Sequence, residues 1–259
     1  MAYDQIFEAM REDRELVNFL SRKARQFKLS NPKLTFEDIQ RNIEDRILRD
    51  AIQNQDKIYS NYPRTEITKA IIKTVLGWDA NRDEVYALLD AMIEKATAVD
   101  GVTGEKGLAG YSAFTVQGLA MLLGQYARIE PNFLKEMLNR HPRLYQTFRF
   151  FIDTWCFQKY YPASGDTGSF ARRTERYVGA PFSRSAGLSP SMYTFLWDLY
   201  KLTGDAAFVQ VLYHENDNTT DFLPHNLFAD DPGAFQQEVA KVIAREGAAI
   251  EVGSVNKQQ

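Results

Sequence analysis

Three short polar segments of this 259-residue chain carry side chains that could act on a ligand. The first covers residues 60–66 and holds an amide, Asn61, and a fixed positive charge, Arg64, where a helix is expected to begin. Free backbone N–H groups and the helix dipole make such a place favourable for an anion. Ordinary helix capping explains the same residues, so both interpretations stay open.

The second segment, residues 104–112, is dense in glycine and includes Glu105 and Tyr111. Glycine permits tight turns and a close approach of a ligand to the backbone. Tyr111 begins a helix whose other residues are mostly apolar, so its hydroxyl needs a partner or faces a cavity. A phenol can transfer a proton where nearby positive charge lowers its pKa. A core tyrosine with a satisfied hydroxyl is the alternative.

The third segment, residues 155–173, combines aromatic, acidic and basic side chains. These are Trp155, Tyr161, Asp166, Arg172 and Arg173. Aromatic rings offer flat apolar faces to sugar rings, and arginine grips carboxylates or sulfates through two hydrogen bonds. Asp166 could instead bond its own backbone in a simple turn. The segment opens a connection of about thirty residues, and connections of that length are usually functional or disordered.

The composition excludes several classes of protein and site. A net charge of -3 and a pI of about 5.7 give no basic field for nucleic acid or anionic lipid. The single cysteine, Cys156, excludes an internal disulfide framework and a cysteine-based zinc site. The 3 histidines lie far apart without ligand spacing, so neither a metal nor a cofactor is expected. No apolar run approaches the roughly 20 residues that a membrane span needs.

Helical periodicity runs along the chain from Tyr3 to Arg245. It predicts one amphipathic helix over residues 1–27, a capping box at residues 35–38, and a helix over residues 143–159. Glycines are expected to end helices at Gly77, Gly204 and Gly247.

The alternation of helices with short turns predicts an all-α fold built from antiparallel helix pairs. About ten such helices favour an α/α toroid or a solenoid over a four-helix bundle. We assign this domain to residues 1–247. Residues 248–259 alternate like a strand that has no partner, so we expect them to be extended and poorly packed. They are interpreted either as the start of a missing β domain or as a floppy tail.

The order and spacing of three motifs indicate a family. Residues 100–111 resemble the "DG…E…GY" segment of heparinase II/III-like polysaccharide lyases, and residues 160–168 resemble the "P-x-x-GD" turn of the same proteins. Residues 199–205 are similar to the helix pair that usually follows. The likeness runs from about Asp45 onward. It implies an incomplete α/α toroid followed by an antiparallel β-sandwich, with this chain truncated just inside the sandwich.

The resemblance implies β-elimination at a uronic acid of an acidic polysaccharide. One group neutralises the C6 carboxylate, a base removes the C5 proton, and an acid protonates the leaving oxygen. By position, Tyr111 would be the catalytic tyrosine and Asn61 the neutraliser. The asparagine is commonly followed by histidine in the family, whereas this chain has Tyr62 and Pro63. A further catalytic histidine of the family lies in the β-sandwich.

The other chemistry-bearing residues of the three segments are expected to bind substrate: Arg64, Glu105, Trp155, Tyr161, Asp166, Arg172 and Arg173. Asn61, Tyr111 and residues 161–173 should then line one concave surface. The expected partners are the acidic polysaccharide and the protein's own C-terminal β-sandwich, and the resemblance suggests a periplasmic or secreted protein. Two alternatives stay open: a glycoside hydrolase that uses Glu105 and Asp166 as acid and base, and a non-catalytic glycan-binding toroid.

Overall fold

The computed structural model describes residues 2–57, 60–99, 101–103, 107–165, 175–182, 190–225, 227 and 230–253. These residues form helices and no strand, which confirms the predicted all-α class. None of the described helices is both long and apolar enough to span a membrane. The chain divides into two compact units, Met1–Leu89 and Asp90–Gln259, with the boundary inside one helix. Each unit is described by itself below.

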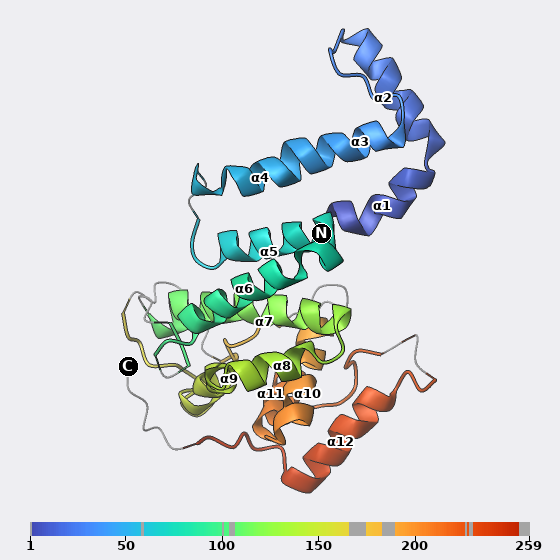
Figure 1. Cartoon of the computed structure of the whole chain (residues 1–259). Helices are drawn as coiled ribbons and strands as arrows, with labels where there is room; N and C mark the ends of the chain where they lie inside the picture. Colours follow the sequence, from blue (N-terminus) through green and yellow to red (C-terminus); the bar gives the residue numbers. More distant parts are fainter. Residues whose placement is uncertain are drawn as a thin grey trace. The chain divides into compact units, whose positions relative to one another are not determined.

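The first unit is a succession of short helices (Figure 1). They are α1 (Ala2–Glu12), α2 (Arg14–Gln26), α3 (Phe36–Ile43), the π-helix η1 (Glu44–Arg49), α4 (Asp50–Gln53), the 3-10 helix η2 (Gln55–Lys57), α5 (Arg64–Leu76) and the first part of α6 (Trp78–Ala96). α3, η1 and α4 follow one another without a break, and α5 packs against η1.

The single helix expected over residues 1–27 is wrong. Asp13 divides it, because its carboxylate accepts the N–H groups of Glu15 and Leu16 at 2.9 and 3.1 Å and so begins a new helix, α2. The predicted capping box is confirmed. The Asp38 N–H donates to Thr35 Oγ1 at 3.3 Å, and the Thr35 N–H donates to the Asp38 carboxylate at 3.2 Å.

The second unit holds the larger apolar core. It contains the end of α6, the π-helix η3 (Leu108–Ser112), α7 (Ala113–Ile129), α8 (Phe133–Arg140), α9 (Arg143–Asp153), α10 (Pro190–Thr203), α11 (Ala207–Glu215) and α12 (Ala234–Glu246). Helices that are adjacent in sequence pack together in several places, as α7 does on α8, α10 on α11 and α11 on α12. α9 contributes three fully buried rings, Phe148, Phe150 and Phe151, to this core.

α9 ends at Asp153, six residues before the predicted end at residue 159. The Thr154 hydroxyl donates to the Phe150 carbonyl at 2.7 Å, and Phe157 and Gln158 then adopt left-handed backbone angles, with φ of 53° and 54°. These angles are incompatible with continuing a right-handed helix. The predicted stops at Gly77, Gly204 and Gly247 are confirmed, since helices end at or just before them.

A network around Arg149 connects α9 to the start of α11. Its guanidinium donates to Asp153 Oδ1 and to Asp205 Oδ1, both at 2.9 Å. Asp205 Oδ1 also accepts the Ala207 N–H, the first of α11, at 3.0 Å, although the N-cap residue is Ala206. The Tyr145 hydroxyl donates to Asp205 Oδ2 at 2.7 Å, and burial together with this bond raises the pKa of Tyr145 to about 12.

The same network holds the segment after α12. The Glu251 carbonyl accepts from Arg149 Nη2 at 2.6 Å, and the Glu251 N–H donates to Gln210 Oε1 at 2.9 Å. The Gly253 N–H donates to Asp153 Oδ1 at 2.7 Å. Residues 248–253 form neither a helix nor a strand and are mostly exposed, as expected for an extended and poorly packed segment, although these hydrogen bonds connect them to α9 and α11. Residues 254–259 lie outside the described residues, and the β-sandwich stays a prediction.

Two glycine substitutions test the packing beneath α9. Gly101 has a φ of +85°, and a Cβ there would lie 2.7 Å from the backbone of Gln146 and Thr147. Gly204 has a φ of +72° and nothing within 4 Å of a Cβ. We expect Gly204→Ala to lower the free energy of unfolding by roughly 1–2 kcal/mol, the cost of a left-handed alanine. Gly101→Ala should cost roughly 1–3 kcal/mol more because it also clashes.

Urea unfolding of the two variants measures this difference. Equal losses would show that the backbone of α9 yields without cost at Gln146 and Thr147.

Candidate functional site

Two of the three polar segments lie side by side in the second unit. Gly107, from the glycine-dense segment, forms an isolated antiparallel bridge with Gly165, from the third segment. Both residues have positive φ, 131° and 65° respectively, which glycine adopts without steric cost. This bridge brings the "DG…E…GY" and "P-x-x-GD" motifs together by backbone pairing.

Tyr111 stands out on the π-helix η3. The Ser112 N–H donates to the Gly107 carbonyl at 3.2 Å, which closes the wide turn. The Tyr111 side chain is 40% exposed, whereas its neighbours Leu108, Ala109, Gly110 and Ser112 are buried. Single π-helical turns occur frequently at functional sites. The alternative of a core tyrosine therefore does not describe Tyr111.

Trp155 and Tyr161, by contrast, are core residues, which differs from the expectation that they bind substrate. They are 1% and 3% exposed, and their rings stack on one another with centroids 6.1 Å apart. The Tyr161 hydroxyl donates to the Phe151 carbonyl at 2.7 Å, and burial raises its pKa well above the usual value. Rings whose faces are covered by protein offer no surface on which a sugar could stack.

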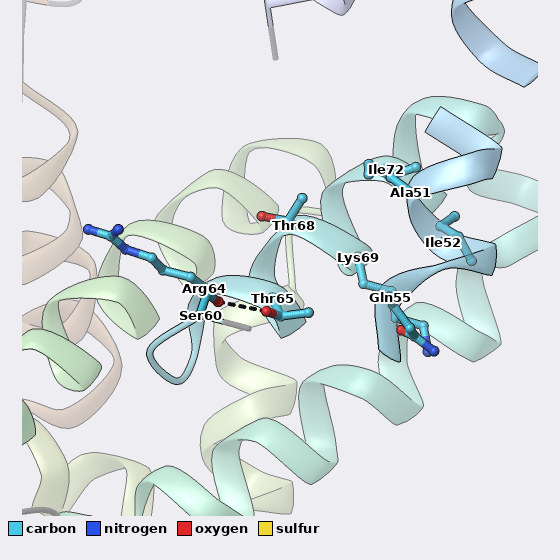
Figure 2. A pocket seen from close by; sticks show the side chains of 9 residues that line it. All are labelled: Ala51, Ile52, Gln55, Ser60, Arg64, Thr65, Thr68, Lys69 and Ile72. Carbon is cyan, nitrogen blue, oxygen red and sulfur yellow. Dashed lines mark hydrogen bonds between the residues drawn. The ribbon is translucent and has the colours of Figure 1, made fainter. Parts of the chain in front are cut away.

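Asn61 and Arg64 belong to the first unit, at the start of α5. Asn61 is exposed, and its carbonyl accepts the Arg64 N–H at 3.0 Å. Arg64 lines a pocket of about 190 Å³ together with Ser60 and Thr65, whose hydroxyls are 2.6 Å apart (Figure 2). The rest of the lining combines the apolar side chains Ala51, Ile52 and Ile72 with the polar side chains Gln55, Thr68 and Lys69.

Four of the predicted site residues lie outside the described residues. They are Glu105, Asp166, Arg172 and Arg173. Their substrate-binding roles, and the acid and base roles of the first two in the hydrolase alternative, stay predictions.

A polar pocket of about 490 Å³ in the second unit was not predicted from the sequence. It is lined by the turn after α9, the loop before α10 and the end of α11. The lining residues are Gln158, Lys159, Glu175, Arg176, His214, Glu215, Asp217 and Asn218. Three separate segments therefore meet to form it, and we call it the polar pocket.

Glu215 organises one wall of the polar pocket. Its side chain is only 2% exposed, and its carboxylate accepts the Tyr177 N–H at 2.8 Å and Arg176 Nε at 3.4 Å. The Arg176 side chain is 48% exposed, so one edge of its guanidinium is held while much of it stays at the surface. The Tyr177 hydroxyl donates to the Phe148 carbonyl at 3.0 Å, and burial raises the pKa of that phenol.

His214 lines the pocket, but one nitrogen of its ring is buried. Its ring meets Trp155 edge-on, with centroids 5.1 Å apart, and its Nδ1 lies 3.9 Å from Glu215 Oε1. Nδ1 is buried and has no hydrogen-bond partner among the described residues. The other two imidazoles are paired: His141 Nε2 lies 2.7 Å from Asp90 Oδ1, and His225 Nδ1 lies 3.1 Å from Gln236 Nε2.

Left-handed backbone occurs on two walls of the polar pocket. Gln158 has a φ of 54°, and Asp217 and Asn218 have φ of 60° and 59°. Such strain in residues other than glycine persists where surrounding structure enforces it, often at ligand clamps. The run Asn-Asp-Asn at residues 216–218 is a sequence signal for this conformation. Phe157 and Gln158 give no such signal.

Neither a metal-binding cluster nor a similar known protein identifies the role of these residues. Within the part of the chain that the structure describes, no three His, Cys, Asp or Glu side chains gather in a way that could hold a metal ion. Comparisons of the chain with family models, with curated proteins and with solved structures found no match.

The buried carboxylate generates a stability prediction. Glu215→Gln keeps the shape and an acceptor for Tyr177, but it removes the charge that faces Arg176. We expect a loss of roughly 1–3 kcal/mol in the free energy of unfolding, as for other charged hydrogen bonds. The control is Glu246→Gln, because Glu246 pairs with Arg245 at the surface, and exposed pairs contribute about 0–1 kcal/mol.

Urea unfolding of Glu215→Gln and Glu246→Gln measures the two losses in the free energy of unfolding. Losses of similar size would contradict the anchoring role of Glu215.

Proposed function

We propose that this chain is the helical toroid part of a protein that cleaves a uronic-acid polysaccharide by β-elimination. The observation that supports the proposal best is the Gly107–Gly165 bridge. It joins two of the three motifs on which the resemblance to polysaccharide lyases rests, and Tyr111 follows Gly107 by four residues on the same turn. The arrangement of the helices as a toroid is part of the proposal.

In this mechanism Tyr111 transfers the proton. Its phenol is 40% exposed and lies on the turn that begins at the Gly107–Gly165 bridge. The role of Asn61, as the group that hydrogen-bonds the C6 carboxylate and makes the C5 proton more acidic, comes from the resemblance alone. Removal of that proton and protonation of the leaving oxygen break the glycosidic bond and leave an unsaturated uronate. Arg172 and Arg173 supply positive charge for the acidic polymer.

The Gly107–Gly165 bridge also supports a second candidate function. Glu105 precedes Gly107 by two residues, and Asp166 directly follows Gly165. A glycoside hydrolase with these carboxyl groups as acid and base is therefore the alternative. Hydrolysis adds water across the bond and leaves no unsaturated product, so ultraviolet absorbance of the products separates the two chemistries.

Tyr111→Phe tests the catalytic assignment in the full-length protein. The substitution removes only the hydroxyl, and because Tyr111 is exposed the fold should be retained. We expect turnover on uronic-acid polysaccharides to fall by roughly 10²–10⁴. Turnover is followed as the ultraviolet absorbance of unsaturated uronate.

Tyr200→Phe is the matched control. The Tyr200 hydroxyl on α10 accepts from Arg245 Nη2 at 2.8 Å. Tyr200 lies in the third motif and not in the two that the Gly107–Gly165 bridge joins, so turnover should be unchanged. A Tyr111→Phe protein with normal turnover would rule out the role of Tyr111.

Asn61→Ala tests the neutralising group. Asn61 is exposed and engages α5 through its backbone carbonyl, which alanine also provides. We expect an unchanged melting temperature and a fall in turnover of about 10²-fold or more, as for loss of a donor to a developing negative charge. Melting curves and rates are measured on the same preparation. A lower melting temperature with normal turnover would instead support a role confined to the helix start.

A further inference from the structure

The end of α2 and the segment that follows it concentrate positive charge. Residues 22–34 contain five Lys or Arg and no Asp or Glu. The net charge of -3 for the whole chain therefore conceals a charge of +5 on these residues and -8 on all the others. We call residues 22–34 the basic turn.

Three of the five cations of the basic turn are not engaged by the protein. They are exposed, and their side chains form no ion pair or hydrogen bond with any residue that the structure describes: Arg22, Arg25 and Lys28. The other two have partners, since Lys23 Nζ donates to Gln26 Oε1 at 3.1 Å and Lys33 interacts electrostatically with Asp38. The three free cations are available to an anionic partner.

The basic turn also exposes large apolar side chains. Phe27, Leu29 and Leu34 are 62%, 58% and 68% exposed. Lys23 Nζ lies 5.7 Å from the centroid of the Phe27 ring, so a cation and an aromatic face are adjacent. A cluster of exposed apolar side chains is a feature of protein and membrane interaction sites.

Backbone hydrogen bonds fix the shape of the basic turn. The Leu29 N–H donates to the Ala24 carbonyl at 2.9 Å, and the Lys28 N–H donates to the Arg25 carbonyl at 3.3 Å. This pair of bonds is a Schellman motif, with Lys28 in the left-handed position at a φ of 51°.

The basic turn is also held at its far end and is left uncovered. The Ser21 hydroxyl donates to the Lys33 carbonyl, which returns the segment to α2. Among the described helices, the pairs that pack closely, such as α3 with η1 and α5 with η1, do not include α2. The exposed side chains are therefore presented on a fixed backbone.

We propose that the basic turn docks on the surface of an anionic phospholipid bilayer. Phe27, Leu29 and Leu34 enter the boundary between headgroups and acyl chains, while the free cations meet phosphate and carboxylate groups of the lipids. Such a surface uses the exposed apolar groups and the positive charge together. This docking uses no residue of the two motifs that the Gly107–Gly165 bridge joins and does not depend on the proposed lyase activity.

Two other partners fit the observations less well. A nucleic acid would satisfy the cations, but leucine side chains offer it neither hydrogen bonds nor a flat ring for stacking, and the charge of -8 on the other residues repels a long polyanion. Two copies that meet through their basic turns would bring like charges together, which disfavours a symmetric dimer at this surface.

Vesicle flotation of the full-length protein tests the proposal. The probes are vesicles of phosphatidylcholine mixed with phosphatidylserine, and vesicles of phosphatidylcholine alone. We expect the partition coefficient to be about tenfold or more higher for the anionic vesicles, because each cation near the surface gains from the lipid charge. This preference should decrease as salt is added, since salt screens the attraction.

Two variants with matched controls connect binding to the basic turn. We expect Arg25→Gln to lower the partition coefficient about fivefold through loss of one cation, and Leu29→Gln about tenfold through loss of an inserted apolar group. The controls are Arg128→Gln and Leu227→Gln, which change an exposed arginine and an exposed leucine of the second unit. Both controls should leave the coefficient unchanged.

Three results would overturn the proposal. The first is equal partitioning into anionic and neutral vesicles, and the second is an unchanged coefficient in both Arg25→Gln and Leu29→Gln. The third is the absence of vesicle binding together with another partner for the basic turn. That partner would be a second copy if sedimentation velocity shows a dimer that Arg25→Gln dissociates, or a nucleic acid if single-stranded RNA binds and Arg25→Gln weakens its binding.

Discussion

A carboxylate buried at the end of a helix organises the candidate functional part of the second unit. Glu215 lies in the last turn of α11, where the helix dipole disfavours negative charge, and it is removed from water. The Tyr177 N–H and the Arg176 guanidinium offset both costs. Because these donors belong to the loop before α10, the carboxylate anchors that loop against α11.

This anchoring extends from the polar pocket toward the Tyr111 turn. Tyr177, held by Glu215, contacts the ring of Trp155, which in turn stacks on Tyr161. Four residues beyond Tyr161, Gly165 pairs with Gly107 at the start of η3. Trp155 and Tyr161, which the sequence predicted to bind sugar, therefore form packed support between the polar pocket and the Gly107–Gly165 bridge. This arrangement explains why the rings are buried while Phe157, Tyr160 and Tyr111 are exposed.

Features that depend on neighbouring residues could be predicted from the sequence, and features that depend on distant ones could not. The capping box at Thr35 and the stop at Gly77 follow from local backbone chemistry. The break at Asp13 has the same kind of cause, but the apolar periodicity of residues 1–27 continues across it and hides it. The polar pocket has no local signature, because His214 and Gln158 meet only through the tertiary fold.

The π-helical turn at Tyr111 makes the direction of this side chain depend on the number of residues in the turn. The Ser112 N–H reaches back five residues to Gly107, one more than in an α-helix. Each residue of an α-helix rotates the next by about 100°, so removal of Ser112 would turn Tyr111 toward the buried position that Ser112 now occupies before α7. A family alignment that places a gap here would leave every residue type intact and still move the phenol. Length, as much as composition, therefore constrains how this segment can vary among relatives.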